Sequence, residues 1–597
     1  MTLGVLLPVS LLGGAGDLPG GRNAELVAKV RSGAISEAKA SWWGYDTADS
    51  TEAIQSAISC GVKKLIIDAQ SGPWYVRPLK GVSNQEIVIE KGAVLCAKRG
   101  AFKDRLDVLL DYRKVENVKI SGPGELRMWR EDYTNRADYC WSEWRHALSF
   151  QGAKNVTVEN LTISRSGGDG IYVNDMTDTV IRNVTCDRNY RQGISVISAE
   201  NLLIEGCTLS NTAGTAPAAG IDFEPNSNRE RLVNCTMRNC LLKDNQVCGI
   251  LFALFYFDAT TRPVSISVEN CRVVGNGQTM DIDAPHSPIN AVKGRISFRG
   301  CAFERTAADA KGIHVRECLD LPVKLDFADC TYREFAADGT AKATALGEAW
   351  IAERYPEANK TPVSYPPRFR HAPATYAAVD AKPGQMVALA PLYARDPVMY
   401  AFYAAKAGEV RFAAKQVLLG KNKKLSDRPV EVCDMSGKAV GSFPMGRIGT
   451  DETPFAVRVP AAGYYTMKFP NRGGTLLLLT QAEAPVAVDL SEKCVNVNGH
   501  PARGWLSVPE DAAPFALLAF GDGGEMVHAT VRDPSGRVAF DRDNISMWVP
   551  FVPAAKPAAG LWQVDLTRPS EGVLDDFRLD LSGVKPYLFL SNEKYWK

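Results

Sequence analysis

The sequence predicts an all-β chain: a parallel β-helix followed by two small antiparallel β-sandwich domains. Three observations predict it. A strand motif recurs along the first half, a second motif recurs in phase with it, and the C-terminal part has short alternating strands without that repeat. Such a repeat is typical of a solenoid, in which each coil can bury its apolar face only against the next coil.

The first motif is a small residue, an aliphatic residue, one variable residue and another apolar residue. Its first five copies are separated by 23, 23, 27 and 29 residues, a drift expected of insertions in the turns. The copies begin at Ala147, Gly170, Gly193, Gly220, Gly249 and Gly312. Apolar residues that alternate in this way have the period of a strand and not of a helix, which indicates stacked parallel strands.

The second motif is Asn, Gly or Asp followed by a compact apolar residue or Cys. The pairs are Asn160-Leu161, Asn183-Val184, Gly206-Cys207, Asn239-Cys240, Asn270-Cys271, Gly300-Cys301 and Asp329-Cys330. The first residue types tolerate the left-handed backbone of a tight corner, and the second suit an inward stack. Because no paired Cys-x-x-Cys spacing is present, we expect these cysteines to act as small hydrophobic residues, without a metal.

At the N-terminal end, residues 1–45 precede the predicted solenoid, which occupies residues 46–355. The stretch Leu3–Leu12 is apolar but too short to span a bilayer, and we interpret it as a weak or trimmed export signal. This interpretation predicts a secreted or periplasmic bacterial protein. Asp49–Ile58 has a capping pattern followed by apolar residues at helical spacing, which predicts a helix that covers the open end of the solenoid.

Beyond the coils, Ala343–Arg354 predicts a helix that closes the far end of the solenoid. The Pro-rich residues 356–377 predict a linker. After it, strands are short and separated by Gly, Pro and Asp turns, which favours two antiparallel β-sandwiches over residues 378–490 and 491–597.

Charge argues against two classes of partner. The chain has 69 Lys and Arg against 68 Asp and Glu, a formal net charge of +1, with the two signs interspersed. Nucleic acids and anionic membranes are bound by strongly basic surfaces, so neither is an expected partner. The sequence makes no prediction of the oligomeric state.

The predicted helix Asp49–Ile58, the coil repeat and Gly-Asp-Gly-Ile-Tyr-Val at 168–173 resemble the pectin-lyase-like superfamily of right-handed parallel β-helices. That superfamily includes polygalacturonase-type glycoside hydrolases, pectate lyases and alginate epimerases, so the resemblance implies a carbohydrate substrate. The catalytic motifs of the polygalacturonases and epimerases are not intact here, and their catalytic residues do not transfer. The whole chain looks like bacterial parallel β-helix repeat proteins.

In each strand motif the aliphatic residues point into the coil and the variable residues point outward, so the latter form columns on one face. Asp222 and Glu224 lie two positions apart on one strand, which places their carboxyl groups roughly 5–7 Å apart. That range overlaps the spacing of both retaining and inverting glycosidases. We interpret the pair as catalytic, with a Ca²⁺ site or an incidental acidic face as the alternatives.

Asp169 lies two coils upstream and is a third candidate, as general acid, or else a turn residue that bonds its own backbone. Arg191 is placed to bind a sugar carboxylate or sulfate, to act as the base of a lyase, or to neutralise the acids. The other predicted substrate-binding residues are Gln192, Tyr172, Asn174, Tyr190, Trp144, Arg145 and His146. His286 and His314 are weaker candidates for the same groove.

The leading hypothesis is a glycoside hydrolase that cleaves a polysaccharide or oligosaccharide with two carboxylates from Asp222, Glu224 and Asp169, without a cofactor. The first alternative is a polysaccharide lyase or C5-epimerase of uronate-containing glycans, with Arg191, His146 or Tyr172 as the base and Ca²⁺ or arginine at the substrate carboxylate. The second alternative is a glycan-binding solenoid without catalytic activity.

Overall fold

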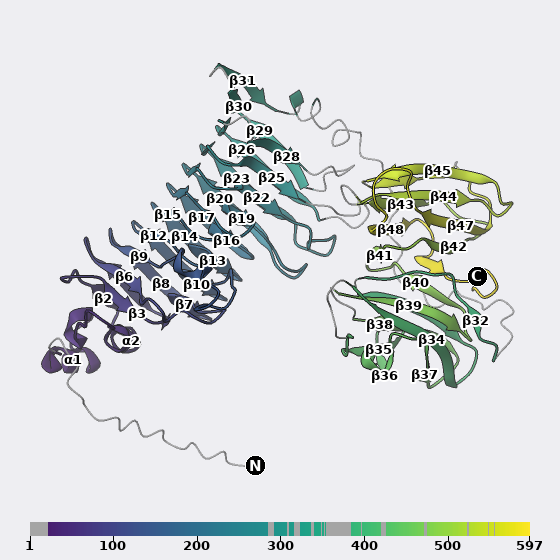
Figure 1. Ribbon diagram of the computed structural model, residues 1–597, viewed down its shortest axis with the longest axis horizontal. Coiled ribbons are helices and arrows are strands. Elements are labelled where there is room, and N and C mark those ends of the chain that lie inside the picture. Colours follow the sequence, from purple (N-terminus) through teal and green to yellow (C-terminus); the bar gives the residue numbers. More distant parts are fainter. Residues whose placement is uncertain are drawn as a thin grey trace, which may run out of the picture. The chain divides into compact units, whose positions relative to one another are not determined.

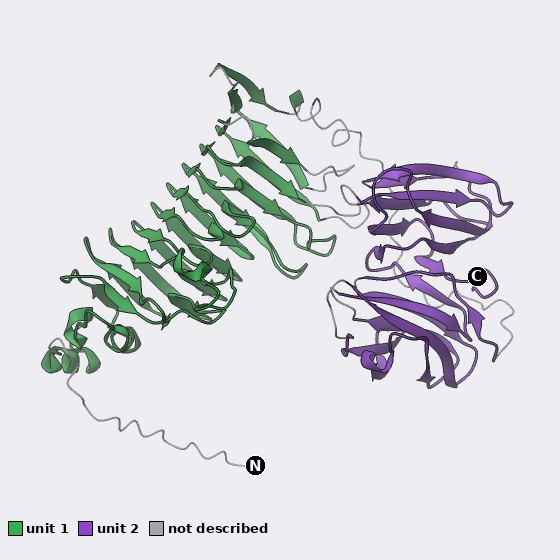
Figure 2. Ribbon diagram, in the orientation of Figure 1, with its two compact units in different colours: residues 1–285, 292–316, 322–354 green, residues 286–291, 317–321, 355–597 purple. Residues whose placement is uncertain are grey.

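The structure is a computed structural model that describes residues 22–283, 292–306, 310–315, 323–335, 340–347, 349–350, 353, 384–395, 397–419, 425–470, 474–521, 525–546, 548–553 and 556–596. The chain divides into two compact units (Figure 2). Unit 1 comprises residues 1–285, 292–316 and 322–354, and unit 2 comprises residues 286–291, 317–321 and 355–597.

Unit 1 is a parallel β-helix built from three long sheets, as predicted (Figure 1). The first sheet runs in the order β1 (Glu37–Lys39), β2 (Lys64–Ile67), β5 (Gln85–Ile89), β8 (Glu116–Ser121), β11 (Lys154–Glu159), β14 (Met176–Arg182), β17 (Ala199–Glu205), β20 (Leu232–Arg238), β23 (Val264–Glu269), β26 (Gly294–Arg299) and β29 (Val323–Ala328). The second runs in the order β28 (Lys311–Val315), β25 (Gln278–Asp283), β22 (Cys248–Ala253), β19 (Ala219–Phe223), β16 (Gln192–Val196), β13 (Ile171–Asn174), β10 (Leu148–Gln151), β7 (Leu110–Arg113) and β4 (Leu79–Lys80).

The third sheet of unit 1 contains the short strands that follow the corner residues. Its order is β3 (Trp74–Val76), β6 (Val94–Ala97), β9 (Glu125–Arg127), β12 (Thr162–Ser164), β15 (Thr185–Asp187), β18 (Thr208–Ser210), β21 (Leu241–Lys243), β24 (Arg272–Val274), β27 (Ala302–Arg305), β30 (Cys330–Phe335) and β31 (Ala341–Leu346). Each coil therefore contributes one strand to each sheet.

The strand motif forms the second sheet, and its register explains the small first residue. Ile194 pairs with Ile221 and Ile221 with Ile250, so the aliphatic residues stack inward. A Cβ atom added at Gly193 would lie 2.4 Å from the carbonyl oxygen of Gly220 in the next coil. Adjacent coils approach too closely there for a side chain.

One coil of the second sheet lacks the full strand motif. Strand β25 pairs Met280 with Ile250 and with Ile313, so it fills the gap between the copies at Gly249 and Gly312. Its strand carries Thr279 where the other copies have a small residue. The inward apolar positions are kept, which is what the packing requires.

The corner column is confirmed. Asn160, Asn183, Asn239, Asn270 and Asp329 all have positive φ values between 50° and 57°. Gly206 and Gly300 in the same column have φ values of 63° and 60°. The side-chain amide of Asn183 also donates to Asn160 Oδ1 at 3.1 Å, so neighbouring coils are joined at their corners.

The cysteine ladder consists of buried free thiols. Contact with the preceding thiol in the ladder, together with burial, raises the pKa of Cys240 and of Cys271 to about 12. Because the thiolate is the reactive species, we predict that an alkylating reagent at neutral pH modifies exposed Cys140 in the native protein and spares Cys240 and Cys271. Peptide mass mapping before and after unfolding measures this, and native labelling of Cys240 would contradict it.

The predicted N-terminal helix is α2 (Thr51–Ser59), and a further helix, α1 (Ala24–Arg31), precedes it. Strand β1 already pairs with β2, so the first sheet starts at Glu37, ahead of the expected residue 46. The helix predicted over Ala343–Arg354 is wrong in its first part. Residues Ala341–Leu346 instead form β31, antiparallel to β30, because the open edge of β30 offers backbone hydrogen bonds to a segment with good helix propensity.

Unit 2 contains the antiparallel sheets expected in the C-terminal part. Its largest sheet runs in the order β36 (Ala439–Pro444), β35 (Pro429–Asp434), β38 (Gly463–Phe469), β33 (Val398–Ala404), β40 (Val486–Asp489), β49 (Tyr587–Phe589), β42 (Ala502–Val508), β47 (Gly560–Thr567), β44 (Val527–Arg532) and β45 (Val538–Ile545). Strands β40 and β49 pair with each other, so this sheet is continuous across the boundary expected at residue 490.

Two four-stranded sheets complete unit 2. One contains β32 (Val387–Ala388), β39 (Thr475–Ala482), β34 (Gly408–Leu418) and β37 (Thr453–Val459), and the other contains β41 (Val495–Asn498), β48 (Asp576–Ser582), β43 (Ala516–Gly521) and β46 (Val549–Phe551). The predicted linker 356–377 lies outside the described residues. Among the described residues, no helix has the length and apolar character needed to cross a membrane.

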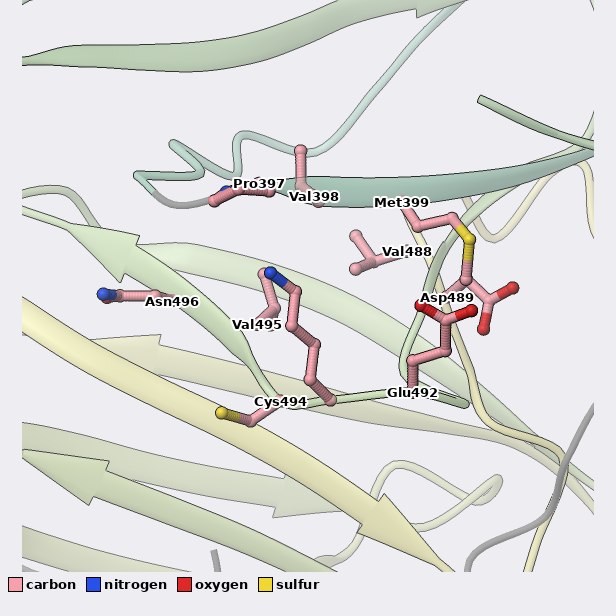
Figure 3. A pocket seen from close by; sticks show the side chains of 10 residues that line it. Pro397, Val398, Met399, Val488, Asp489, Glu492, Cys494, Val495 and Asn496 are labelled. Carbon is pink, nitrogen blue, oxygen red and sulfur yellow. The ribbon is translucent and has the colours of Figure 1, made fainter. Parts of the chain in front are cut away.

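Unit 2 encloses a small cavity between β33 and the segment from Val488 to Asn496 (Figure 3). Its volume is about 20 Å³, and Pro397, Met399 and Glu492 are among the side chains that line it. A cavity of this size holds about one water molecule. It is too small for a sugar ring.

Candidate active site

The outward column predicted from the strand motif lies in register on the second sheet. Its members are Asp111, Ser149, Tyr172, Ser195, Asp222, Leu251, Asp281 and His314. The expectation that the whole column faces solvent is wrong at Ser149, Ser195 and Asp222, which are fully buried. The nearby Gln192 is also fully buried, and its Nε2 atom donates to Asp222 Oδ2 at 2.9 Å.

A groove of about 470 Å³ opens beside these buried residues. It is lined by Leu106, Val108, Arg113, Glu143, Trp144, His146, Gln151, Tyr172, Arg191, Ile197, Glu224 and Asn226. The segment before β10, strand β13 and the ends of β16 and β19 all contribute to it. Glu143 from the first of these segments accepts a hydrogen bond from Thr215 Oγ1 at 3.4 Å, so the insertion before β19 contacts the groove wall.

Asp222 and Glu224 form a close carboxyl pair, of which Glu224 lines the groove and Asp222 does not. Gln192 Nε2 lies 2.9 Å from Asp222 Oδ2 and 3.4 Å from Glu224 Oε2. Glu224 lines the groove and its side chain is 21% exposed, whereas Asp222 is completely buried. Burial, then the charge of Glu224, raises the pKa of Asp222 well above its usual range, although Arg191 acts in the opposite direction. Burial and the neighbouring Glu224 therefore both favour the protonated form of Asp222.

This proton makes the stability of the fold depend on pH. Because the folded pKa of Asp222 exceeds its unfolded value, its contribution to stability is complete below the ordinary carboxyl pKa of about 4. That contribution is lost as the pH rises through the raised value, by up to about 1.4 kcal/mol per pH unit between the two. Asp222→Asn carries a permanent amide donor, so we predict that the variant gains stability relative to the wild type as the pH rises.

Denaturant unfolding of the wild type and Asp222→Asn at a series of pH values measures this difference. The difference cancels the carboxyl groups far from the groove and reports on Asp222 together with the neighbours coupled to it. Two parallel stability curves would show that Asp222 is not protonated in the folded protein.

Arg191 forms ion pairs with three carboxyl groups, those of Glu224, Asp169 and Glu143. Its Nη2 atom donates to both carboxylate oxygens of Glu224, at 2.9 and 2.8 Å. Its Nη1 atom lies 3.9 Å from Asp169 Oδ1, and its Nε atom lies 3.8 Å from Glu143 Oε2. Burial opposes the charge of Arg191, but Asp169 and Glu224 outweigh it and raise the pKa of the guanidinium. Arg191 is thus a permanent cation among carboxylates.

His146 and Tyr172 stack on each other in the groove, with ring centroids 4.6 Å apart and planes inclined by 15°. His146 Nδ1 lies 3.2 Å from Asp169 Oδ2 and accepts a hydrogen bond from the backbone N–H of Asp169 at 3.1 Å. Asp169 itself is fully buried. Burial, then the charge of Asp169, raises the pKa of Tyr172 to about 12, so its phenol stays protonated.

Several predicted binding residues lie in the groove and others do not. Trp144, His146, Tyr172 and Arg191 line it, and Asn174 Nδ2 lies 3.5 Å from the Tyr172 hydroxyl. Gln192 contacts Asp222 and Glu224 and is itself fully buried.

Arg145 does not bind substrate in this arrangement, which corrects the prediction. Its guanidinium is fully buried and donates to the backbone carbonyls of Phe102, Lys103 and Cys140. Arg145 and His146 are adjacent in the sequence, and only the second faces the groove. Arg145 holds the segment before β10 in place through these hydrogen bonds.

Tyr190 is absent from the groove lining among the described residues, and its ring packs against Gly214 of the insertion, where a Cβ atom would lie 2.3 Å away. His314 lies three coils beyond Asp222 and pairs with Asp281 Oδ1 at 2.8 Å. His286 lies outside the described residues.

The outward column that contains Gln151 and Glu224 is expected from the sequence, whereas Glu143, Arg113 and Asn226 of the groove wall are not. Arg113 pairs in register with Gln151, one coil apart, so an outward column extended to β7 includes it. Glu143 lies on an irregular segment and has no periodic signal. Its only sequence cue is its position beside Trp144.

The acids do not form an evident metal site. Among the residues that the structure describes, no group of three or more His, Cys, Asp or Glu side chains has an arrangement suited to a metal ion. Arg191 occupies the position between the carboxylates Asp169 and Glu224 where a cation would be needed. The arrangement fits proton transfer between neighbouring groups in a groove open to solvent.

Comparisons with known proteins agree with the fold. Residues 114–303 match a family model described as a right handed beta helix region, and this stretch contains most of the groove. The chain contains a right-handed β-helix. Two curated proteins of Bacillus subtilis (strain 168) match part of it.

Uncharacterized protein YclG is 29% identical over 146 residues, which are 21% of this chain and 25% of that protein. The SPbeta prophage-derived uncharacterized protein YorA is 28% identical over 166 residues, which are 24% of this chain and 28% of that protein. The matches thus span about a quarter of the length of these relatives. Among solved structures, a polygalacturonase from Erwinia carotovora ssp. carotovora is 15% identical with a TM-score of 0.36, over 51% of this chain and 93% of that chain.

Proposed function

We propose that this protein is a glycoside hydrolase that cleaves glycosidic bonds of a polysaccharide or oligosaccharide in the groove of its β-helix. The observation that carries the proposal is the groove-lining carboxyl group of Glu224, which is 21% exposed and is held by two hydrogen bonds from Arg191 in a groove of about 470 Å³. Glycoside hydrolysis needs two groups that differ in protonation, one to activate water or attack the sugar and one to protonate the leaving oxygen. Glu224 is the group that meets the substrate.

The shape and lining of the groove suit a sugar. Trp144 and the stacked Tyr172 and His146 supply flat apolar faces, and charged or amide groups such as Arg113, Gln151 and Asn226 supply hydrogen bonds. Such a mixture of aromatic walls and a few polar groups is typical of small-molecule sites. Neutral or acidic sugars both fit this lining.

One observation favours the lyase or epimerase alternative. His146 and Tyr172 are stacked close to Arg191, and a base, a phenolic acid and an arginine are the groups that such chemistry uses on a uronate. Against it, both inner hydrogen bonds of Arg191 Nη2 go to Glu224, so that part of its charge is not free for a substrate carboxylate.

A panel of plant, algal and bacterial polysaccharides separates these functions. We predict new reducing ends, no rise in the ultraviolet absorption of unsaturated sugars, and the same rate with and without a chelator. An ultraviolet-absorbing product would identify a lyase, and inversion of uronate configuration without cleavage would identify an epimerase. Binding without any product would support the solenoid that only binds glycan.

A further inference from the structure

The proposed hydrolase needs a proton donor for the leaving oxygen, and none of the three predicted carboxylates is suited to that role. Glu224 accepts two hydrogen bonds from Arg191, so both of its carboxyl oxygens act as acceptors there and not as proton donors. Asp222 and Asp169 are both fully buried and do not line the groove. Asp169, expected from the sequence to be a general acid, is therefore out of reach of a substrate.

Few of the titratable groups that line the groove can donate a proton to the leaving oxygen. Arg113 and Arg191 are permanent cations, and the Tyr172 phenol gives up its proton only in strong alkali, with a pKa of about 12. Glu143 lies beside the Arg191 guanidinium, with its Oε2 atom 3.8 Å from Nε. His146 remains, and imidazole is the side chain best able to give and take a proton near neutral pH.

The surroundings of His146 fix one ring nitrogen and leave the other free. Nδ1 lies between the backbone N–H of Asp169 at 3.1 Å and the Oδ2 atom of the same residue at 3.2 Å. The backbone N–H can donate to Nδ1 when this nitrogen carries no proton, and the carboxylate can accept from Nδ1 when it carries one. Neither oxygen of Asp169 has a hydrogen-bond partner of its own, so this carboxylate is available to His146.

Tyr172 and Arg191 also lie near His146 and Asp169, and neither separates His146 Nδ1 from the Asp169 carboxylate. The Tyr172 ring covers one face of the imidazole. Arg191 Nη1 approaches Asp169 from its other oxygen, at 3.9 Å, and holds the carboxylate from the far side. Since Nδ1 is committed to Asp169, Nε2 is the nitrogen that remains for a ligand in the groove.

We infer that His146 protonates the leaving glycosidic oxygen through Nε2 and that Asp169 is its positioning residue. This inference rests on the proposed hydrolase function. The acid is the imidazolium form of His146, with its Nδ1 proton directed at the Asp169 carboxylate. As the bond from the anomeric carbon to the glycosidic oxygen breaks, the bonding pair stays on that oxygen, which takes the Nε2 proton and leaves a neutral imidazole. The water that replaces the leaving group gives one proton to the Glu224 carboxylate and its oxygen to the anomeric carbon. Return of that proton through solvent to His146 completes one hydrolysis.

The leaving group provides the test, because fluoride departs without protonation. The probes are the oligosaccharide that the wild type cleaves in the polysaccharide panel and the glycosyl fluoride of the same sugar. We expect His146→Gln to lower kcat on the oligosaccharide by about 100-fold or more, and on the fluoride by less than about tenfold. Asp169→Asn should show the same selective loss to a smaller degree, with KM changed little, because it acts through His146.

His314→Gln is the matched control, because His314 also pairs with an aspartate, Asp281, on the same face but outside the groove lining. It should leave both rates unchanged. Thermal unfolding checks that each variant is folded, and Asp169→Asn serves as the second route to the answer if His146→Gln is unstable.

The outcomes separate the inference from the proposed function. If the wild type hydrolyses the oligosaccharide and His146→Gln loses both activities equally, His146 is not the proton donor and the inference is overturned. If the folded His146→Gln variant keeps its full rate on the oligosaccharide, His146 is again not the proton donor and the inference is overturned. If the wild type forms no hydrolysis product on any polysaccharide, the proposed function fails, and this inference fails with it.

Discussion

Glu224→Gln is expected to fold normally and to hydrolyse its polysaccharide at least about 100-fold more slowly than the wild type. The carboxylate of Glu224 is the accessible member of the acid pair, and an amide neither accepts a proton from water nor attacks a sugar. Gln retains the shape of the side chain and still accepts a hydrogen bond from Arg191. The loss should therefore appear in kcat, as measured by the release of reducing ends.

Glu205→Gln is the matched control for this substitution. Glu205 lies on β17 in the first sheet and pairs with Arg182 and Arg238, so it also holds a carboxylate between arginines, but outside the groove lining. Its variant should retain the wild-type rate. Near-normal activity of Glu224→Gln would place the chemistry elsewhere.

Arg191→Leu is expected to lower the free energy of unfolding by about 3–5 kcal/mol at neutral pH. Its guanidinium is the cation shared by Asp169, Glu143 and Glu224, and removal leaves the buried Asp169 carboxylate beside other acids without compensation. The remaining carboxyl groups then favour protonation, so acidification should restore part of the lost stability. Denaturant unfolding at neutral and acidic pH measures both effects.

Arg238→Leu serves as the control for Arg191→Leu. Arg238 makes a comparable contact, with Nε 2.7 Å from Glu205 Oε1, but its side chain is 42% exposed. Exposed ion pairs contribute little to stability, so this variant should lose much less. Equal losses in the two variants would show that Arg191 does not compensate a buried cluster of charges.

The repeat made the β-helix predictable, because packing between coils dictates the residues at each repeated position. The inward Ile194–Ile221–Ile250 stack and the Asn160–Asn183 corner both left a periodic signal in the sequence. The strand β31 left none. Its Ala-rich segment has helix propensity, and only the free edge of β30 decides its conformation.

The parts of the site that follow the coil repeat were predictable from the sequence. The parts that depend on how neighbouring segments pack over the strands were not. The position of Asp222 and Glu224 on one outward face followed from strand alternation. The burial of Asp222 and its contact with Gln192 arise from packing that strand alternation does not encode. Arg145 is buried while His146 lines the groove because both lie on an irregular segment with no period. The partnership of His146 with Asp169 likewise arises from two segments that only the fold brings together.

The mass of the products formed in ¹⁸O-labelled water tests the central claim most directly. If the groove carries out hydrolysis, the two fragments of a cleaved oligosaccharide together weigh as much as the substrate plus one water, and one fragment carries a single ¹⁸O atom. Glu224→Gln should form neither fragment at a comparable rate. Fragments that together weigh the same as the substrate, without the label, would contradict hydrolysis and establish elimination.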